Sequence, residues 1–290
     1  MARLYVIGNG FDLHFGLKTG VLDFVSKLQN QSIYSQIDGS FDNFLSVMEE
    51  YGIDWSNYEL SLAEMDLEAI ENQNMMMPDY MSDYESDREG VIYSMQVYLD
   101  GINDAIDSAL KEMVEDANYE LEEKMVEDEC LPRFISGDAI LSFNYTSTIE
   151  MLFELPEDLR ILHIHGLYED NDPLIFGYKD SDEKYKRRIS SYDDGDYYTY
   201  QQQMAIYKFY CGWKKAVQKE KLNSFLGHCQ EIDEVVVLGH SMGAVDSWYL
   251  EQIEKVLHPT IWHVSYHGAD EVKDNSQQYS FKSKIRFFAW

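Results

Sequence analysis

The stretch that decides the fold is Leu4-Tyr5-Val6-Ile7-Gly8-Asn9-Gly10-Phe11-Asp12. Its first four residues are continuously apolar, which is typical of a strand buried on both faces of a parallel sheet. Two glycines follow at once, and an apolar pattern with helical spacing begins at Val21. In α/β proteins, a strand that leads through glycines into a helix presents bare backbone N–H groups to a phosphate. The spacing is G-x-G-x(5)-G rather than G-x-G-x-x-G, so a tight turn that binds nothing stays open as the alternative.

Further apolar runs predict six more strands, separated by segments with helical spacing. The strands are expected at 139–143, 160–165, 174–176, 235–238, 261–265 and 285–288, and the helices at 21–28, 41–48, 149–153, 206–217 and 246–257. Residues 179–203 are charged and rich in tyrosine, and we predict a surface loop or lid there. Strands that alternate with helices predict an α/β fold, with a parallel, Rossmann-like sheet and helices on both faces.

The net charge of −30 over 290 residues is concentrated in one part of the chain. Residues 54–129 contain 23 acidic residues and three basic ones, and their apolar positions have helical spacing. We therefore predict an acidic helical insertion at 54–130 between two parts of an α/β nucleotide-binding core, 1–53 and 131–290. A chain this acidic is not expected to bind nucleic acid directly, because such binding needs lysine and arginine at the phosphates.

The cysteines and the hydropathy pattern indicate the compartment. Cys130, Cys211 and Cys229 are an odd, scattered set without metal-binding spacing, so we expect free thiols in a reducing cytoplasm and no metal site. No apolar run approaches the roughly 20 residues that span a bilayer, and the N-terminus lacks the layout of a signal peptide. The expectation is a cytoplasmic protein without a membrane segment.

Polar residues gather where the predicted strands end. These groups lie at 8–12, 144–146, 163–166 and 239–246. Because ligands of parallel sheets bind beyond the carboxyl ends of the strands, the four groups predict one crevice. Each group also has a structural explanation, since Asn144 suits an Asx turn or a helix cap and His165 suits a strand-end histidine with its hydrogen bonds satisfied.

Several of these motifs carry a family resemblance. G-N-G-F-D-L at 8–13, G-L-K-T at 16–19, F-N-Y-T at 143–146, I-H-G at 164–166, and G-H-S-M-G at 239–243 with Asp246 resemble the AbiH family of phage abortive-infection proteins. The match runs from the N-terminus to about Leu250 and leaves out the acidic insertion. The order of the motifs is also similar to that of the sirtuin-like NAD-binding fold of many antiviral effectors.

The resemblance implies a nucleotide site and an activity. The implied cofactor-binding residues are Gly8, Asn9, Gly10, Asp12, Gly239, Ser241 and Asp246, and the implied catalytic residues are Asn144 and His165. In that assignment the early glycines hold the pyrophosphate of NAD, the asparagine and the histidine attend the nicotinamide ribose, and the late turn lies near the adenosine. We therefore expect an antiphage defence protein that binds NAD without a metal ion and cleaves its nicotinamide–ribose bond.

The residue types suit that reaction. Cleavage of the nicotinamide–ribose bond passes through an oxocarbenium-like state, which needs stabilised positive charge and a directed nucleophile. A neutral imidazole at His165 can accept a proton from a ribose hydroxyl or a water near pH 7, and Asn144 can orient that group. Asp12 departs from the pattern, because the sirtuin-like turn more often has a small hydroxyl residue there. A carboxylate repels a pyrophosphate unless it caps the helix, faces a ribose or recruits Mg²⁺, which leaves the identity of the nucleotide open.

A serine hydrolase is the first alternative function. Gly239-His240-Ser241-Met242-Gly243 after a predicted strand matches the nucleophile elbow, with Ser241 as the nucleophile. That fold places an acid and then a histidine after the serine, whereas here His267 is the last histidine and little sheet remains.

The second alternative is a non-catalytic nucleotide sensor or partner-binding protein. In that case the tyrosines and methionines of the acidic insertion contact a basic partner. A solvated helical face explains the same composition. The protein partner that we expect is either a second copy of the chain or a companion defence protein.

Overall fold

The computed structural model describes residues 2–31, 55, 58–59, 62, 71–72, 75–124, 132–178, 197–229, 231–267 and 271–290. Its elements, in chain order, are β1 (Arg3–Ile7), α1 (Asn9–His14), α2 (Val21–Gln29), α6 (Glu85–Leu121), β2 (Ala139–Ser142), α7 (Thr148–Leu152), β3 (Arg160–His163), α9 (Tyr197–Gly212), α10 (Lys219–Gly227), β4 (Glu234–Leu238), the 3-10 helix η2 (Ala244–Asp246), α11 (Ser247–Leu257), β5 (Ile261–Tyr266), α12 (Glu271–Ser276) and β6 (Lys284–Ala289). The chain divides into two compact units. Unit 1 consists of Met1–Asp23, Lys111–Ile175 and Ala216–Trp290, and unit 2 of Phe24–Leu110 and Phe176–Lys215.

The six described strands all belong to unit 1 and form one parallel sheet. Their order is β3-β2-β1-β4-β5-β6, which is the doubly wound order of dinucleotide-binding folds. The strand order reverses between β1 and β4, which pair with Ile7 opposite Leu238. The predicted parallel α/β fold is therefore confirmed.

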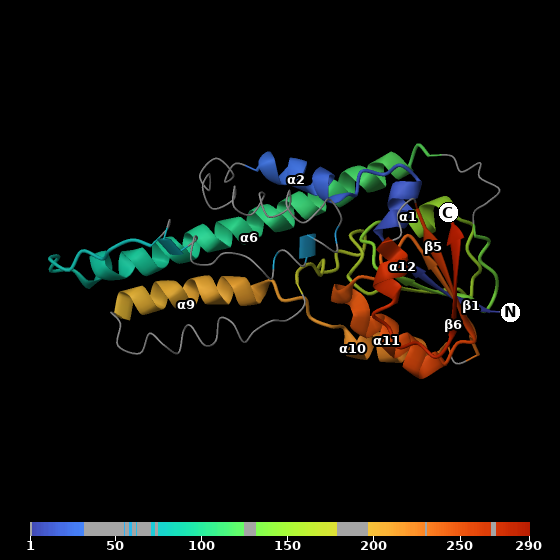
Figure 1. The fold of residues 1–290 in the computed structure, drawn as a ribbon. Helices are drawn as coiled ribbons and strands as arrows, with labels where there is room; N and C mark the ends of the chain where they lie inside the picture. The colour runs from blue at the N-terminus through green and yellow to red at the C-terminus, as the bar shows by residue number, and fades with distance from the viewer. Residues whose placement is uncertain are drawn as a thin grey trace. The chain divides into compact units, whose positions relative to one another are not determined.

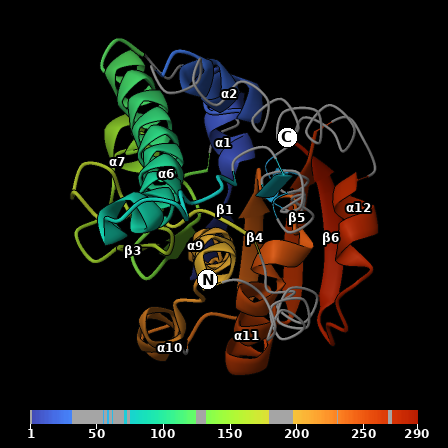
Figure 2. The same ribbon diagram turned by 90° about the vertical axis from the view of Figure 1, so that its left-hand side faces the viewer.

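Side chains alternate between the two faces of this sheet, and helices cover both. On one face, Leu4 and Val6 of β1 pack with the buried residues of α10 and α11. On the other face, Tyr5 and Ile7 pack with residues of α1 and α7. Figure 1 shows α10 and α11 along one side of the sheet and α1 on the other, and Figure 2 shows the same layers from the side. Continuously apolar strands are the composition that this double coverage requires.

Unit 2 is built on helices. The part of α6 in this unit buries a stripe with steps of three and four residues, namely Val91, Met95, Leu99, Ile102, Ile106 and Leu110. Helix α9 lies alongside, and Trp213, just after it, donates from Nε1 to Asn103 Oδ1 at 2.6 Å. Unit 2 also contains a buried ion pair, in which Lys215 Nζ lies 2.9 Å from Glu59 Oε1.

The structure differs from the sequence prediction in three places. Residues 174–176 form no strand, because Ile175 N–H donates to the His165 carbonyl in a loop. Helix α9 begins at Tyr197, within the predicted loop at 179–203, and ends at Gly212 rather than at 217. A helix also begins at Asn9, where the glycines suggested a turn.

Other predictions fall partly outside the described residues. The helix expected at 41–48 lies outside them, as do 179–196 of the predicted loop. Among the described residues of 54–130 there is helix and no strand, but the boundaries of that insertion stay a prediction, and the two units divide the chain at other positions. Within the described parts, no helix combines the length and the apolarity needed to cross a membrane.

Candidate functional site

The turn after β1 packs directly against the turn after β4, where the strand order reverses. The Gly8 N–H donates to the Leu238 carbonyl at 3.0 Å, and the Gly10 N–H donates to the Gly239 carbonyl at 2.7 Å. These are two of the N–H groups that the sequence suggests as phosphate donors. In the structure both already have an acceptor within the protein.

Glycine is needed in these turns because the two main chains are in contact. A Cβ on Gly8 would lie 2.7 Å from Cα of His240, and one on Gly10 would lie 2.8 Å from Cα of Gly239. Gly239 has a φ of +62°, and a Cβ there would lie 2.1 Å from the Phe11 nitrogen. A side chain at any of the three positions would therefore push the turns apart.

The carboxylate of Asp12 is turned into the protein. Asp12 lies in α1, is 1% exposed, and accepts a 2.7 Å hydrogen bond on each oxygen, from the hydroxyls of Thr146 and Thr148. Burial raises its pKa from the ordinary 3.8 to about 6, against the lowering effect of these hydroxyls, of the Asn144 side chain and of His163. Asp12 was expected beside the nucleotide, and in the structure one of its oxygens holds the turn after β2 and the other holds the first residue of α7.

Asn144 follows β2 and is held through its main chain. Its N–H donates to the Ser142 hydroxyl at 3.2 Å, and its carbonyl oxygen lies 3.1 Å from Nδ1 of His163. The side chain is 7% exposed, and its Oδ1 atom has no hydrogen-bond partner among the described residues. Buried amide oxygens are nearly always hydrogen-bonded, which makes this atom a candidate for contact with a ligand.

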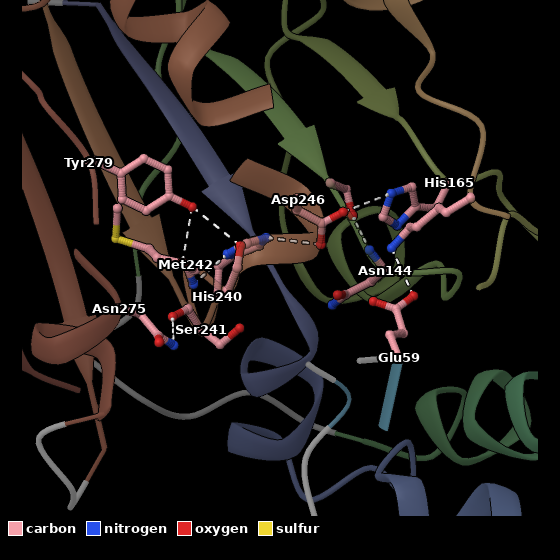
Figure 3. Close-up of polar contacts among 12 residues, drawn as sticks. Glu59, Asn144, His165, His240, Ser241, Met242, Asp246, Asn275 and Tyr279 are labelled. Carbon is pink, nitrogen blue, oxygen red and sulfur yellow. Dashed lines mark hydrogen bonds and ion pairs between the residues drawn. The ribbon is translucent and has the colours of Figure 1, made fainter. Parts of the chain in front are cut away.

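Asp246, at the end of η2, lies between two histidines (Figure 3). Its Oδ1 is 3.4 Å from Nε2 of His165, and its Oδ2 is 3.8 Å from Nε2 of His240. The Met242 N–H donates to Nδ1 of His240 at 2.9 Å, so that nitrogen is unprotonated and the ring proton lies on Nε2, toward the carboxylate. Of the two residues expected to be catalytic, His165 therefore has a carboxylate next to its ring, whereas the side chain of Asn144 hydrogen-bonds to Asp12.

Aromatic rings surround this cluster. The Phe143 ring lies 5.1 Å from the His165 ring and 4.5 Å from the His240 ring, and Tyr249 lies 6.0 Å from His165. Such surroundings strengthen the electrostatic contacts among the polar groups, because little water screens them. Over the described ranges, no group of three or more His, Cys, Asp or Glu side chains is placed to hold a metal ion.

Two side chains from the C-terminal part of the chain hold the turn that contains Ser241. Asn275 donates to the Ser241 carbonyl at 2.9 Å, and the Tyr279 hydroxyl donates to the Met242 carbonyl at 3.0 Å. The left-handed residue here is Met242, with a φ of 54°, whereas the nucleophile elbow places its strain at the serine. No described histidine hydrogen-bonds to the Ser241 hydroxyl. The serine-hydrolase alternative thus lacks a base within the described chain.

Sequence reasoning missed two residues of this site, and for one residue that it named, Asn9, the structure gives only its position. His163 and His240 were given no role, although His163 begins the polar group at 163–166 and His240 lies in the motif G-H-S-M-G at 239–243. Polar residues at a strand end were the available signal for both. Asn9, expected to bind the cofactor, is the first residue of α1 and is half-buried.

The comparisons with known proteins place the chain in a family. No curated protein shows significant similarity to it in sequence. A family model described as "Bacteriophage abortive infection AbiH" matches residues 4–266, which extend from β1 to the end of β5 and include all nine predicted site residues. The chain belongs to the AbiH family of bacteriophage abortive infection proteins.

Proposed function

We propose that this AbiH protein contributes to abortive infection by binding NAD and hydrolysing its nicotinamide–ribose bond. The observation that carries the proposal is the contact of buried His165 with the partly buried Asp246 beyond the carboxyl ends of parallel strands. The buried Oδ1 atom of Asn144, which follows the neighbouring strand and has no hydrogen-bond partner among the described residues, adds to it. Ligands of doubly wound sheets bind at those ends, next to the point where the strand order reverses.

His165 is the proposed general base. The negative charge of Asp246, whose Oδ1 lies 3.4 Å from Nε2, favours the tautomer of His165 with the proton on Nε2 and the lone pair on Nδ1. Nδ1 then takes a proton from the water that attacks the ribose carbon, and Asp246 stabilises the imidazolium that forms. In the balanced reaction, NAD⁺ and water give ADP-ribose, nicotinamide and a proton.

Asn144 is the proposed orienting residue. Its buried Oδ1 suits a hydrogen bond from a ribose hydroxyl or from the attacking water. Because its main chain is held on both sides, the amide can serve this role without first being ordered by the ligand.

The glycine turns are the proposed place of the rest of the nucleotide. The Gly8 and Gly10 N–H groups donate to carbonyls, so their proposed part is to allow the backbone to come close rather than to donate to a phosphate. Asn9, Gly239 and Ser241 stay in the proposal as contacts to the phosphates and the adenosine.

Nicotinamide release from NAD by the purified protein tests the proposal. His165→Gln and Asn144→Ala should each lower the rate about 10²–10⁴-fold, because the loss of a base or an orienting group costs that much. His228→Gln is the matched control, since His228 is an exposed histidine just after α10, and this variant should keep the full rate. The melting temperature of each variant shows that it is folded.

The same variants test the proposal in infected cells. Cells with the wild-type protein should lose NAD during infection, and cells with His165→Gln should lose both the NAD depletion and the protection. NAD that stays constant during an infection in which the wild type protects would contradict the proposal.

Exposed apolar side chains in unit 2 favour a second candidate function, the binding of a protein partner. Met77, Met81 and Tyr84 are 80%, 92% and 72% exposed. Residues 75–110 around them contain eight acidic residues and one basic residue, Arg88. Exposed apolar groups mark contact surfaces, and this charge selects a basic partner.

Replacing these three residues by serine separates the two candidates. The triple variant should lose protection against phage while it keeps the NAD-cleaving rate, if unit 2 binds a companion or target protein. Tyr119→Ser is the control, because Tyr119 is 69% exposed on the acidic helix α6 but belongs to unit 1. Full protection by the triple variant would remove this candidate.

A further inference from the structure

His163, the last residue of β3, has an oxygen atom next to each ring nitrogen. Nδ1 lies 3.1 Å from the carbonyl oxygen of Asn144, and Nε2 lies 2.9 Å from Oε1 of Glu150 on α7. The side chain of His163 is 7% exposed. Carbonyl and carboxylate oxygens accept hydrogen bonds but do not donate them, so both contacts are hydrogen bonds only when both ring nitrogens carry a proton. The geometry therefore points to an imidazolium.

The charged groups around His163 favour that form. They are Glu150 from α7 and Asp12 from α1. Burial alone lowers the pKa of His163, but Glu150, the Asn144 carbonyl and Asp12 outweigh it and raise the pKa above its ordinary value of 6.5. Burying a cation costs much less free energy when a carboxylate lies within hydrogen-bond distance than when the cation is unpaired.

His240, which follows β4, is fixed in a different protonation state. Nδ1 of His240 accepts the Met242 N–H, so His240 cannot carry a proton on both nitrogens without breaking that bond. The two histidines thus have different contacts. His240 lies next to the Asp246 carboxylate, and His163 contacts the main chain of Asn144.

Asn144 is the residue that depends on His163. Its N–H and its carbonyl are each held by one side chain, and only the second of these contacts can change with pH. We propose that protonated His163 is a positioning residue, whose imidazolium holds the Asn144 carbonyl and so fixes where the Asn144 amide presents Oδ1. For its effect on catalysis the proposal rests on the proposed function, but the state of His163 can be tested without it.

Loss of one ring proton from His163 would remove one of its two hydrogen bonds. A neutral ring would keep its remaining proton either toward Glu150 or toward Asn144. In the first case the Nδ1 lone pair would face the lone pairs of the Asn144 carbonyl, and the turn would move away. The raised pKa makes the bonded state complete below pH 6.5 and weaker as the pH rises through the pKa of the folded protein.

Nitrogen NMR of histidine-labelled protein tests the state of the ring directly, with His163→Gln to assign the signals. Both ring nitrogens of His163 should be protonated at pH 6.5, and its measured pKa should lie above the ordinary histidine value of 6.5. Glu150→Gln should lower the pKa of His163 by about one unit or more, because it removes the paired charge. Glu154→Gln, an exposed carboxylate just after α7, is the control and should leave it unchanged.

The same two variants test the positioning. The side-chain amide signals of Asn144 should shift in Glu150→Gln at neutral pH and not in Glu154→Gln, whether or not NAD is cleaved. If NAD is cleaved, the alkaline limb of the rate profile should move to lower pH in Glu150→Gln alone. A single protonated nitrogen on His163 at pH 6.5, or unmoved Asn144 signals in Glu150→Gln, would overturn the proposal.

Discussion

The two units of this chain differ in the features that stability alone does not explain. Unit 1 encloses polar groups, and Asp12, Asn144 and His165 are each less than a tenth exposed. Unit 2 displays apolar groups, and Met81 and Tyr84 are largely exposed. Buried polar groups and clustered exposed apolar groups both cost free energy or solubility, so each marks a region shaped by something other than stability. The proposed chemistry accordingly lies in unit 1, and the proposed contact with a partner lies in unit 2.

The largest expected effect comes from comparing a glycine of each unit. Gly239→Ala should lower the free energy of unfolding by about 3 kcal/mol or more, because its Cβ would meet the Phe11 nitrogen and its φ is left-handed. Gly90→Ala in α6 has nothing within 4 Å of the new Cβ, so it should change stability by at most about 1 kcal/mol, in the stabilising direction. Urea denaturation measures both. Equal effects would mean that the turns are not in tight contact.

The buried charge of unit 1 should appear in the pH dependence of stability. Folded Asp12 titrates near pH 6 rather than 3.8, so its contribution is fully present below pH 3.8 and is lost as the pH rises through about 6. The loss is on the order of 3 kcal/mol. The asparagine of the Asp12→Asn variant has no such titration. The free energy of unfolding of the variant minus that of the wild type should therefore increase by that amount between pH 3.5 and pH 7.

An exposed carboxylate provides the control for Asp12. Asp158 has a lowered pKa, chiefly because the Ser136 hydroxyl donates to it, so the difference between Asp158→Asn and the wild type should change in the opposite sense over the same range. A flat difference for Asp12→Asn would show that its carboxylate is not buried as described.

Ser241 gives a smaller effect and separates two kinds of enzyme within unit 1. If its hydroxyl only hydrogen-bonds a nucleotide, Ser241→Ala should weaken binding by about 0.5–1.5 kcal/mol and leave activity intact at saturating NAD. A fluorophosphonate probe should then leave the wild-type protein unlabelled. Stoichiometric labelling of Ser241 would instead establish a nucleophile and favour the hydrolase.

The smallest effect is expected at the surface of unit 2. Met81→Ser should change the free energy of unfolding by less than about 0.5 kcal/mol, since the side chain is almost wholly exposed. Met95→Ser, on the buried stripe of α6, should cost about 2 kcal/mol or more. A large cost for Met81→Ser would mean that this segment is packed, and the assignment of a contact surface to unit 2 would fail.

The sheet could be predicted from sequence because its signal is local. Runs such as 235–238 are apolar at every position, as strands covered on both faces must be. The run at 174–176 has the same composition but is held in a loop by the His165 carbonyl, a contact that no local pattern contains. The start of α1 was missed for a similar reason. Gly10 lies in this helix despite its low helix propensity, because the backbone of the distant Gly239 leaves no room for a side chain there.

The site could be predicted only in part. Strand-end position singled out Asn144, His165 and Asp246, and the structure places His165 next to Asp246, while the roles of all three stay a prediction. It could not show that Asp12 faces inward, since its partners Thr146 and Thr148 lie on another element. The task of His163 depends on two acceptors that come from the turn after β2 and from α7, so it also needed coordinates.

The contact among Gly8, Gly10 and Gly239 limits how this protein can evolve. The nearest atom to an added Cβ belongs at each position to the main chain of the opposite turn, so substitution of a neighbouring side chain cannot make room for one. A substitution at any of the three glycines is therefore tolerated only if both turns move together. A lineage that lost its ligand would keep these glycines for as long as it kept the sheet. The glycine pattern at the start of the chain is thus a requirement of the architecture, whichever ligand the site binds.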